Sequence, residues 1–516
     1  MILALSRWIT KLNLNIEQTR FSTQPDRTAV TTTELQLPAG NRRIAVLPLA
    51  NLSSDAKDEI FSDGMTEELI SALSKIAGLR VIARTSVMRY KESKKPIGVI
   101  SKELNVSAIL EGSVRKAGNK IRITIQLADP ETEEQLWSAK YDRDLEDIWA
   151  VQSEIAQKVA DELEVQIKKS ERLNLDKRAT DNKEAYSLYL EGRHFLNNRT
   201  EESLKKAIER FDKALEKDPQ YALAYTGVAD SRAVLALLEF LPPKEAFPKA
   251  RTAAEKALEI DNRLAEAHTS LGVVRFQYDW DWGGAEKEFK RAIELNPSYA
   301  PAHQFYADFL KSQGRFDEAL SEMSYAGALD PLSLSINTGI GHVLYLSRQY
   351  DRAIEQYRNT IKLDPNFIQA RLWFGRPYLQ KRMYREAIAE LGQAVALSGG
   401  STISLAMLGH ANGTAGNKDE AKKILEKLMD RSKRQYVPSY WIAMIHIGLG
   451  DKDQAFTWLG RAFQERSSWL AWAKVEPRFD SLRTDPQFIS LLVRMRLIQK
   501  KESALGIRGW IKGPNK

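Results

Sequence analysis

Apolar and polar residues follow two different periods along this chain, and the change of period divides it into two parts. In the first part, short apolar runs such as residues 44–49 alternate with amphipathic stretches. Ile121, Ile123, Ile125 and Leu127 alternate strictly with polar residues, which predicts a half-buried antiparallel strand. From about residue 183 onward, apolar residues recur at the spacing of an amphipathic helix.

The pattern of the first part predicts the order β-α-β-α-β-β-β-α, which defines an α/β domain with a small mixed sheet. Asp63 and Thr66 are plausible N-caps of its first helix, and Gly78 is expected to end that helix. Gly118-Asn119 predicts a hairpin turn. The expected strands cover residues 44–49, 79–83, 108–116, 121–127 and 134–141, and the later helices cover residues 96–104 and 145–168.

A repeat of constant length organises the second part. Small residues fall at intervals of 34 residues, and a proline follows three of them after 12 residues. Such a period predicts stacked helix pairs, in which the small residue lets two helices approach closely. The repeated alanines are Ala285, Ala319, Ala353, Ala387, Ala421 and Ala455, and the prolines are Pro297, Pro331 and Pro365. A further row of small residues precedes them: Ala307, Gly341, Gly375, Gly409 and Ala443.

These repeats resemble the tetratricopeptide repeat (TPR), whose signature is a bulky then a small residue in the first helix, alanine in the second and a closing proline. The resemblance implies an all-α superhelical solenoid behind the α/β domain. The first part, from "IAVLPLANLSSD" through "IRITIQLADPETEEQLWSAKYDRDLEDIWAVQSEIA", resembles the TolB-like N-terminal domain of bacterial signalling proteins. In that family the domain precedes a TPR array, as in regulatory halves of class III adenylate cyclases and CadC-type transcription regulators.

The expected organisation follows from these patterns. Residues 1–41 form a disordered or linker segment, 42–168 the TolB-like domain and 169–182 a second linker. Residues 183–466 form a solenoid of roughly eight helix pairs, 467–498 a C-terminal capping segment and 499–516 a basic tail. "KVEPRFDSLRTDPQFISLLVRM" resembles the closing segment of such arrays.

Composition and motifs argue against enzymatic chemistry. The chain has no cysteine, so thiol catalysis and disulfides are excluded. It contains no phosphate-binding loop, no H-E-x-x-H and no G-x-S-x-G, and its six histidines lack metal-ligand spacing. We therefore expect no catalytic, cofactor or metal site. Asp63-Gly64 and Arg84-Thr85-Ser86 lie where loops leave strand ends, so they either bind a small ligand or serve as caps and turns.

The remaining prediction is protein binding. First helices of a solenoid line its concave face, and polar and aromatic residues there suit an extended peptide or a helix. The predicted groove residues are Gln304, Asp308, Lys311, His342, Tyr345, Arg376, Gln380 and His410. The net charge of +8 is interspersed, so no nucleic-acid binding is expected.

Two functions follow from this prediction. The first is a non-enzymatic scaffold or sensor in bacterial signalling, with one or more protein partners. The alternative is the regulatory part of an adenylate cyclase or winged-helix transcription regulator whose effector domain is absent from this chain. No apolar run is long enough to span a membrane, so a cytoplasmic location is expected. The periplasm is the alternative if the chain is the exported part of a longer membrane protein.

Overall fold

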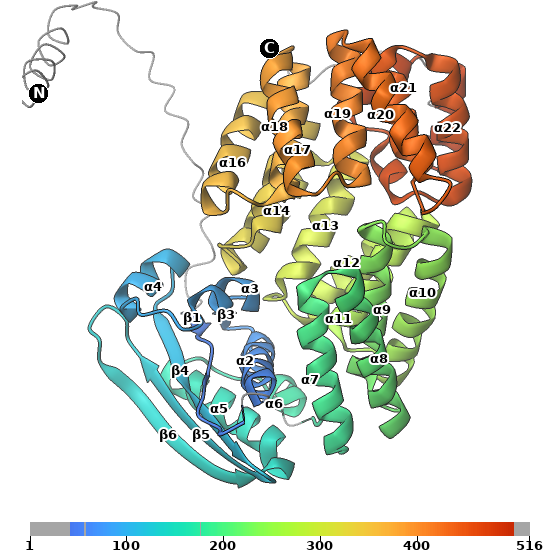
Figure 1. Ribbon diagram of the computed structural model, residues 1–516. Helices are drawn as coiled ribbons and strands as arrows, with labels where there is room; N and C mark the ends of the chain where they lie inside the picture. Colours follow the sequence, from blue (N-terminus) through green and yellow to red (C-terminus); the bar gives the residue numbers. More distant parts are fainter. Residues whose placement is uncertain (1–41, 56–57, 176, 500–516) are drawn as a thin grey trace, which may run out of the picture. The chain divides into compact units, whose positions relative to one another are not determined.

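The computed structural model describes residues 42–55, 58–175 and 177–499 (Figure 1). The expected linker 1–41 and the tail from residue 500 lie outside the described residues. An α/β domain with a mixed sheet comes first and a long run of paired helices follows, which confirms the predicted fold class.

The α/β domain holds a six-stranded sheet whose main order is β3-β1-β4-β5-β6, with β2 paired to β4. The pairs β1–β3, β1–β4 and β2–β4 are parallel, whereas β4–β5 and β5–β6 are antiparallel. The strands are β1 (Arg42–Val46), β2 (Ala50–Asn51), β3 (Leu79–Val81), β4 (Ala108–Ala117), β5 (Lys120–Ala128) and β6 (Gln135–Asp144). The helices are α2 (Glu59–Ser74), α3 (Arg84–Val87), η2 (Met88–Tyr90), α4 (Ile97–Leu104), η3 (Leu145–Asp147), α5 (Ile148–Glu162) and α6 (Lys169–Leu175).

The burial of the strands explains their sequence patterns. Ile44, Ala45 and Val46 of β1 are fully buried, so both faces of this central strand are covered, and β3 and β4 pair its two edges. In β5, Ile123 and Ile125 are fully buried while the intervening polar residues are exposed. The predicted alternation of β5 is therefore confirmed.

The first helix differs from the prediction at its start. Helix α2 begins at Glu59 after Asp58, so Asp63 and Thr66 lie inside it and the predicted N-caps are wrong. The Thr66 hydroxyl instead donates to the Ser62 carbonyl and accepts from the Leu49 amide, both at 3.0 Å. The helix is buried along its length against the sheet, and this tertiary packing outweighs the local capping signal.

The last helix of the domain also ends earlier than the sequence predicted. Helix α5 stops at Glu162 rather than near residue 168. Glu164 has a φ of +56°, a left-handed conformation that ends the helical path. Short β2 and α3 were not predicted, because elements of two and four residues carry almost no periodic signal.

Eight helix pairs follow the α/β domain. They are α7 (Lys183–Asn198), α8 (Glu201–Lys217), α9 (Ala222–Leu237), α10 (Pro243–Ile260), α11 (Ala265–Val274), α12 (Trp282–Leu295), α13 (Ala300–Gln313), α14 (Phe316–Leu329), α15 (Leu334–Leu346), α16 (Tyr350–Leu363), α17 (Ile368–Gln380), α18 (Tyr384–Leu397), α19 (Thr402–Ala415), α20 (Lys418–Arg431), α21 (Ser439–Leu449) and α22 (Lys452–Glu465). A π-helical turn, η4 (Arg275–Asp279), extends α11.

Close helix crossings explain the small residues of the repeat. All six repeated alanines are fully buried. A Cβ atom added at Gly341 would lie 2.6 Å from the ring of Tyr357, so only glycine fits at that crossing. Gly314 ends α13 with a φ of +84°, a left-handed conformation that glycine adopts without strain.

Among the described residues, three short helices follow the last pair: η5 (Ser468–Trp472), η6 (Pro477–Leu482) and α23 (Pro486–Arg494). Phe479, Leu470 and Phe488 are fully buried in a core that they share with helices α15 to α22. No helix of the described residues is both long and apolar enough to cross a bilayer.

Candidate functional site

The predicted groove residues lie on four consecutive first helices. Gln304, Asp308 and Lys311 are on α13, His342 and Tyr345 on α15, Arg376 and Gln380 on α17, and His410 on α19. We call the surface formed by these eight residues the first-helix face. The structure brings its members together, because each first helix packs against the next.

Five of these eight side chains are buried. Lys311, Tyr345 and Arg376 are at most 2% exposed, and His342 and His410 are at most 6% exposed. Gln304, Asp308 and Gln380 remain partly exposed. The burial arises because residues 468–482, which we call the closing segment, pack against this face.

A buried carboxylate anchors the closing segment. Glu476 Oε1 accepts a hydrogen bond of 2.5 Å from the Tyr345 hydroxyl, and Glu476 Oε2 lies 3.5 Å from Nη1 of Arg376. Arg478 donates to the same carboxylate at 3.0 and 2.9 Å. The group is therefore a cluster of two guanidinium cations around one carboxylate, with all three side chains at most 3% exposed.

Burial and neighbouring charges together shift the pKa values of the groups in this cluster. Burial favours a neutral Glu476, but the cations of Arg478 and Arg376 outweigh it and lower the pKa of Glu476 to about 2. Burial, reinforced by Arg478, lowers the pKa of Arg376 to about 10. Burial, again with Arg478, lowers the pKa of His410 to about 4, so this imidazole is neutral at pH 7.

Tryptophans of the closing segment make a second set of contacts. Trp469 Nε1 donates to Glu239 at 2.8 Å, and Trp441 Nε1 of α21 donates to the same oxygen at 2.5 Å. The Trp469 ring packs edge-on against Trp373 at 5.4 Å, and the Arg376 guanidinium lies 3.7 Å from the Trp373 ring centroid. Glu239 belongs to the loop after α9, so the closing segment joins distant units of the array.

The α/β domain engages the array at other places, and both belong to one compact unit. Arg193 of α7 donates to Glu67 of α2 at 2.8 Å. Burial alone would raise the pKa of Glu67. The cations of Arg193 and Arg84 outweigh burial, so the pKa of Glu67 is lowered overall. A partly buried polar cluster therefore fixes α2 against the first helix of the array.

Inter-unit turns supply further contacts to the α/β domain. Asn296 Nδ2 donates to the Ser74 hydroxyl at 2.9 Å. The Ser86 hydroxyl donates to Asp330 Oδ1 at 2.5 Å, and the Ala83 amide donates to the Leu329 carbonyl at 2.8 Å. Asn296 and Asp330 directly precede the repeated prolines, so the turns of two units hold the domain. Ser86, which the sequence offered as a candidate ligand residue, contributes to this contact between the α/β domain and the array.

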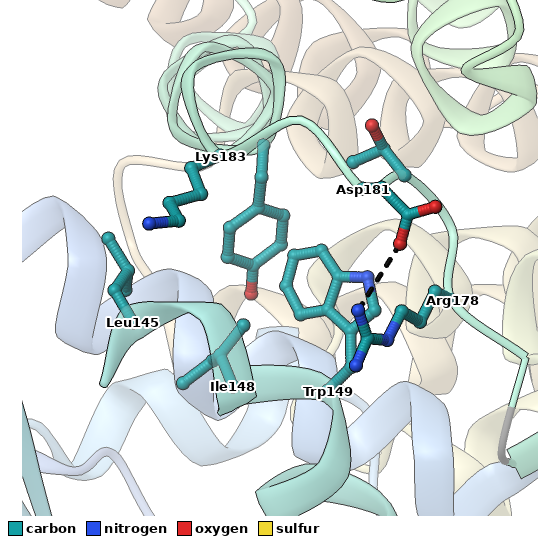
Figure 2. A pocket seen from close by; sticks show the side chains of 8 residues that line it. Leu145, Ile148, Trp149, Arg178, Asp181 and Lys183 are labelled. Carbon is teal, nitrogen blue, oxygen red and sulfur yellow. Dashed lines mark hydrogen bonds and ion pairs between the residues drawn. The ribbon is translucent and has the colours of Figure 1, made fainter. Parts of the chain in front are cut away.

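A small cavity lies where the α/β domain meets the start of the array (Figure 2). Its volume is about 140 Å³, well below the roughly 300–1,000 Å³ of small-molecule sites. Leu145, Ile148, Trp149 and an Arg178–Asp181 ion pair of 3.3 Å line it. Its size does not suit a cofactor. Among the described residues, no group of three or more His, Asp or Glu could hold a metal ion.

Comparisons with known proteins agree with the repeat pattern. Models of the tetratricopeptide repeat family match residues 338–401 and 403–434. "Putative adenylate cyclase 3" of Rhizobium meliloti is 36% identical over 244 residues, which is 46% of this chain and 41% of that protein. "Transcriptional regulator HilA" of Salmonella typhimurium is 28% identical over 144 residues, 28% of this chain and 26% of that protein. The chain thus matches less than half the length of these relatives.

Solved structures with TPR helices are similar in part. Yeast Tom70 is 18% identical, with a TM-score of 0.39, and the match covers 63% of this chain and 67% of Tom70. PilF of Pseudomonas aeruginosa is 22% identical, with a TM-score of 0.31 over 41% of this chain and 95% of PilF. Within the array, residues 338–401 and 403–434 are the part that the models of the tetratricopeptide repeat family match.

The closing segment is the functional feature that sequence reasoning placed but did not use. Its sequence was assigned to a cap, yet nothing in the 34-residue period indicated that it would cover the first-helix face. Glu476 was the available signal, because an acidic residue between apolar neighbours in a capping segment requires buried cationic partners.

Proposed function

We propose that this chain is a non-enzymatic protein-interaction module of bacterial signalling, with a TolB-like α/β domain fixed to a TPR array. Its first-helix face binds a segment of a partner protein. The observation that supports this proposal is that this face already binds a peptide segment, residues 468–482, through one carboxylate and an edge-on contact between Trp469 and Trp373. A partner segment with an acidic residue flanked by aromatic residues takes the place of the closing segment.

The chemistry of the face supports this choice of partner. Arg376 and Arg478 offer charge-assisted hydrogen bonds to a carboxylate, and Trp373 offers a flat apolar surface. Arg478 belongs to the closing segment, so only Arg376 remains for an incoming carboxylate when the segment leaves. Gln304 and Gln380 stay partly exposed in the closed form, so they are open to a partner before displacement.

A labelled peptide with the sequence of residues 467–482 tests the recognition, measured by fluorescence anisotropy on the full chain. The Glu476→Gln variant of the full chain should bind this peptide more tightly than the wild-type chain, because its own segment is held less strongly. A peptide that carries the same Glu476→Gln change should bind that variant at least tenfold more weakly than the wild-type peptide.

Ser481→Ala in the full chain is the matched control, because Ser481 lies in the same segment with an exposed side chain. It should leave peptide binding at the wild-type value. Equal binding of the two peptides to the Glu476→Gln chain would refute recognition by the first-helix face.

The similarity to "Putative adenylate cyclase 3" favours a second candidate: the regulatory part of a cyclase or winged-helix regulator. The genomic sequence upstream of the Met1 codon tests it. An in-frame coding segment for a cyclase or winged-helix domain supports this function, and an in-frame stop codon without such a segment contradicts it. In either case we propose a cytoplasmic location, with the periplasm as the alternative for an exported part, and cell fractionation distinguishes the two.

A further inference from the structure

Strand β6 leaves one long edge of the sheet without a neighbouring strand among the residues that the structure describes. It spans ten residues and pairs with β5 alone in that part of the chain. Figure 1 shows β5 and β6 as the two long strands at one margin of the sheet. An edge of this length presents a row of backbone donors and acceptors that can pair with another strand.

The side chains of β6 divide between two faces. Tyr141 is buried opposite Ile123, whereas Lys140 and Asp142 project to the exposed face, where their side chains are about half exposed. A lone lysine in an edge strand normally prevents pairing. Here Asp142 follows two residues later on the same face, 3.9 Å from Lys140 and hydrogen-bonded to Arg122 of β5 at 2.5 Å. In an antiparallel second copy this aspartate also comes opposite the partner's lysine.

We propose that β6 pairs with β6 of a second copy of this chain in an antiparallel two-fold dimer, with Tyr141 opposite Tyr141. The geometry places Lys140 of each copy opposite Asp142 of the other, so the interface contains two opposite-charge pairs. Ser138 then faces Asp144, and the sheet continues across the dimer with its buried face on one side.

Neighbouring registers are less favourable. Moving each strand by one residue in one direction places Lys140 opposite Lys140, and moving it in the other direction places Asp142 opposite Asp142. Both registers join like charges at the two-fold axis. A register that pairs Lys140 with Tyr141 would put the buried face of one copy's sheet and the exposed face of the other copy's sheet on the same side of the joined sheet. Charge and burial therefore select the same register.

Sedimentation velocity of the full chain over a concentration series tests the proposal. The wild-type chain should dimerise, and Lys140→Asp or Asp142→Lys should each weaken dimerisation about tenfold or more, because each change creates two like-charge pairs. The double variant Lys140→Asp/Asp142→Lys should dimerise again. An equimolar mixture of the two single variants should also form a heterodimer.

Lys95→Glu is the control, because it reverses an equally exposed charge just before α4 that pairs with Glu103 of that helix. It should leave dimerisation unchanged. Thermal unfolding of each variant verifies that the fold is intact. A wild-type chain that is monomeric at every concentration, or a double variant that stays as weak as the single variants, would overturn the proposal.

Discussion

Replacing Glu476 by alanine should detach the closing segment from the first-helix face. The change leaves the guanidinium groups of Arg376 and Arg478 buried without their carboxylate. Removing one member of a buried ion pair costs about 3–5 kcal/mol. The pKa of Glu476 leads to a similar figure, because a drop from 4.5 to about 2 corresponds to about 3 kcal/mol of stability at pH 7.

Hydrogen exchange followed by mass spectrometry is the appropriate assay, because it reports local opening of the closing segment separately from global unfolding. A loss of about 3 kcal/mol increases the opening equilibrium about 100-fold. Amides of η5 and η6 should therefore exchange about 100-fold faster in Glu476→Ala, while amides of β4 and β5 should keep their wild-type rates. Ser481→Ala, at an exposed position of the same segment, should change exchange less than about fivefold.

The pH dependence provides a second check. Since the folded-state pKa of Glu476 is depressed, its contribution is fully present above pH 4.5 and is lost as the pH falls towards about 2. Exchange in η6 of the wild-type chain should accelerate over that range, and Glu476→Ala should lack this acceleration. An increase below tenfold in the variant at pH 7 would refute the role assigned to the carboxylate.

Two further changes test the packing and a second carboxylate. Gly341→Ala should destabilise the array by about 1–3 kcal/mol in thermal unfolding, because the new methyl group would lie 2.6 Å from Tyr357. Gly392→Ala, where a Cβ meets no atom within 4 Å, should instead stabilise α18 by about 0.5–1 kcal/mol. Burial raises the pKa of Glu239 to about 7, against the hydrogen bonds from Trp441 and Trp469. Because the folded-state pKa of this acid is raised, its favourable contribution is complete below pH 4.5 and is lost as the pH rises through about 7. Tryptophan fluorescence should titrate near pH 7 in the wild-type chain and not in Glu239→Gln; a titration that persists in the variant would contradict this assignment.

Local periodicity was sufficient to predict the fold class. The 34-residue repeat located the helix crossings because a small residue there faces a bulky side chain of the next helix: a Cβ atom at Gly341 would meet Tyr357. The alternation of Ile121 to Leu127 identified β5 for a similar reason, since one face of that strand contacts the core. The start of α2 was missed because Asp63 and Thr66 carry a capping signal that burial against the sheet overrides.

The environment of the candidate site depends on contacts between distant residues, which a repeat pattern does not encode. The period placed Lys311, Tyr345 and Arg376 on one face, but the residue that neutralises Arg376 lies 100 positions later in the chain. A polar residue on a first helix satisfies the same period whether it faces water, a partner or the end of its own chain.

The charge balance of the buried cluster determines what a partner must supply. When the closing segment leaves, both Glu476 and Arg478 leave with it, and Arg376 remains beside Trp373 without a counter-charge. An incoming segment with no acidic residue leaves that guanidinium desolvated and unpaired, which costs several kcal/mol. An acidic residue at the position of Glu476 restores the pair and the hydrogen bond to Tyr345. If the face binds a partner as proposed, a segment that lacks a carboxylate would be disfavoured by this penalty, as much as a segment that has one would be favoured by attraction.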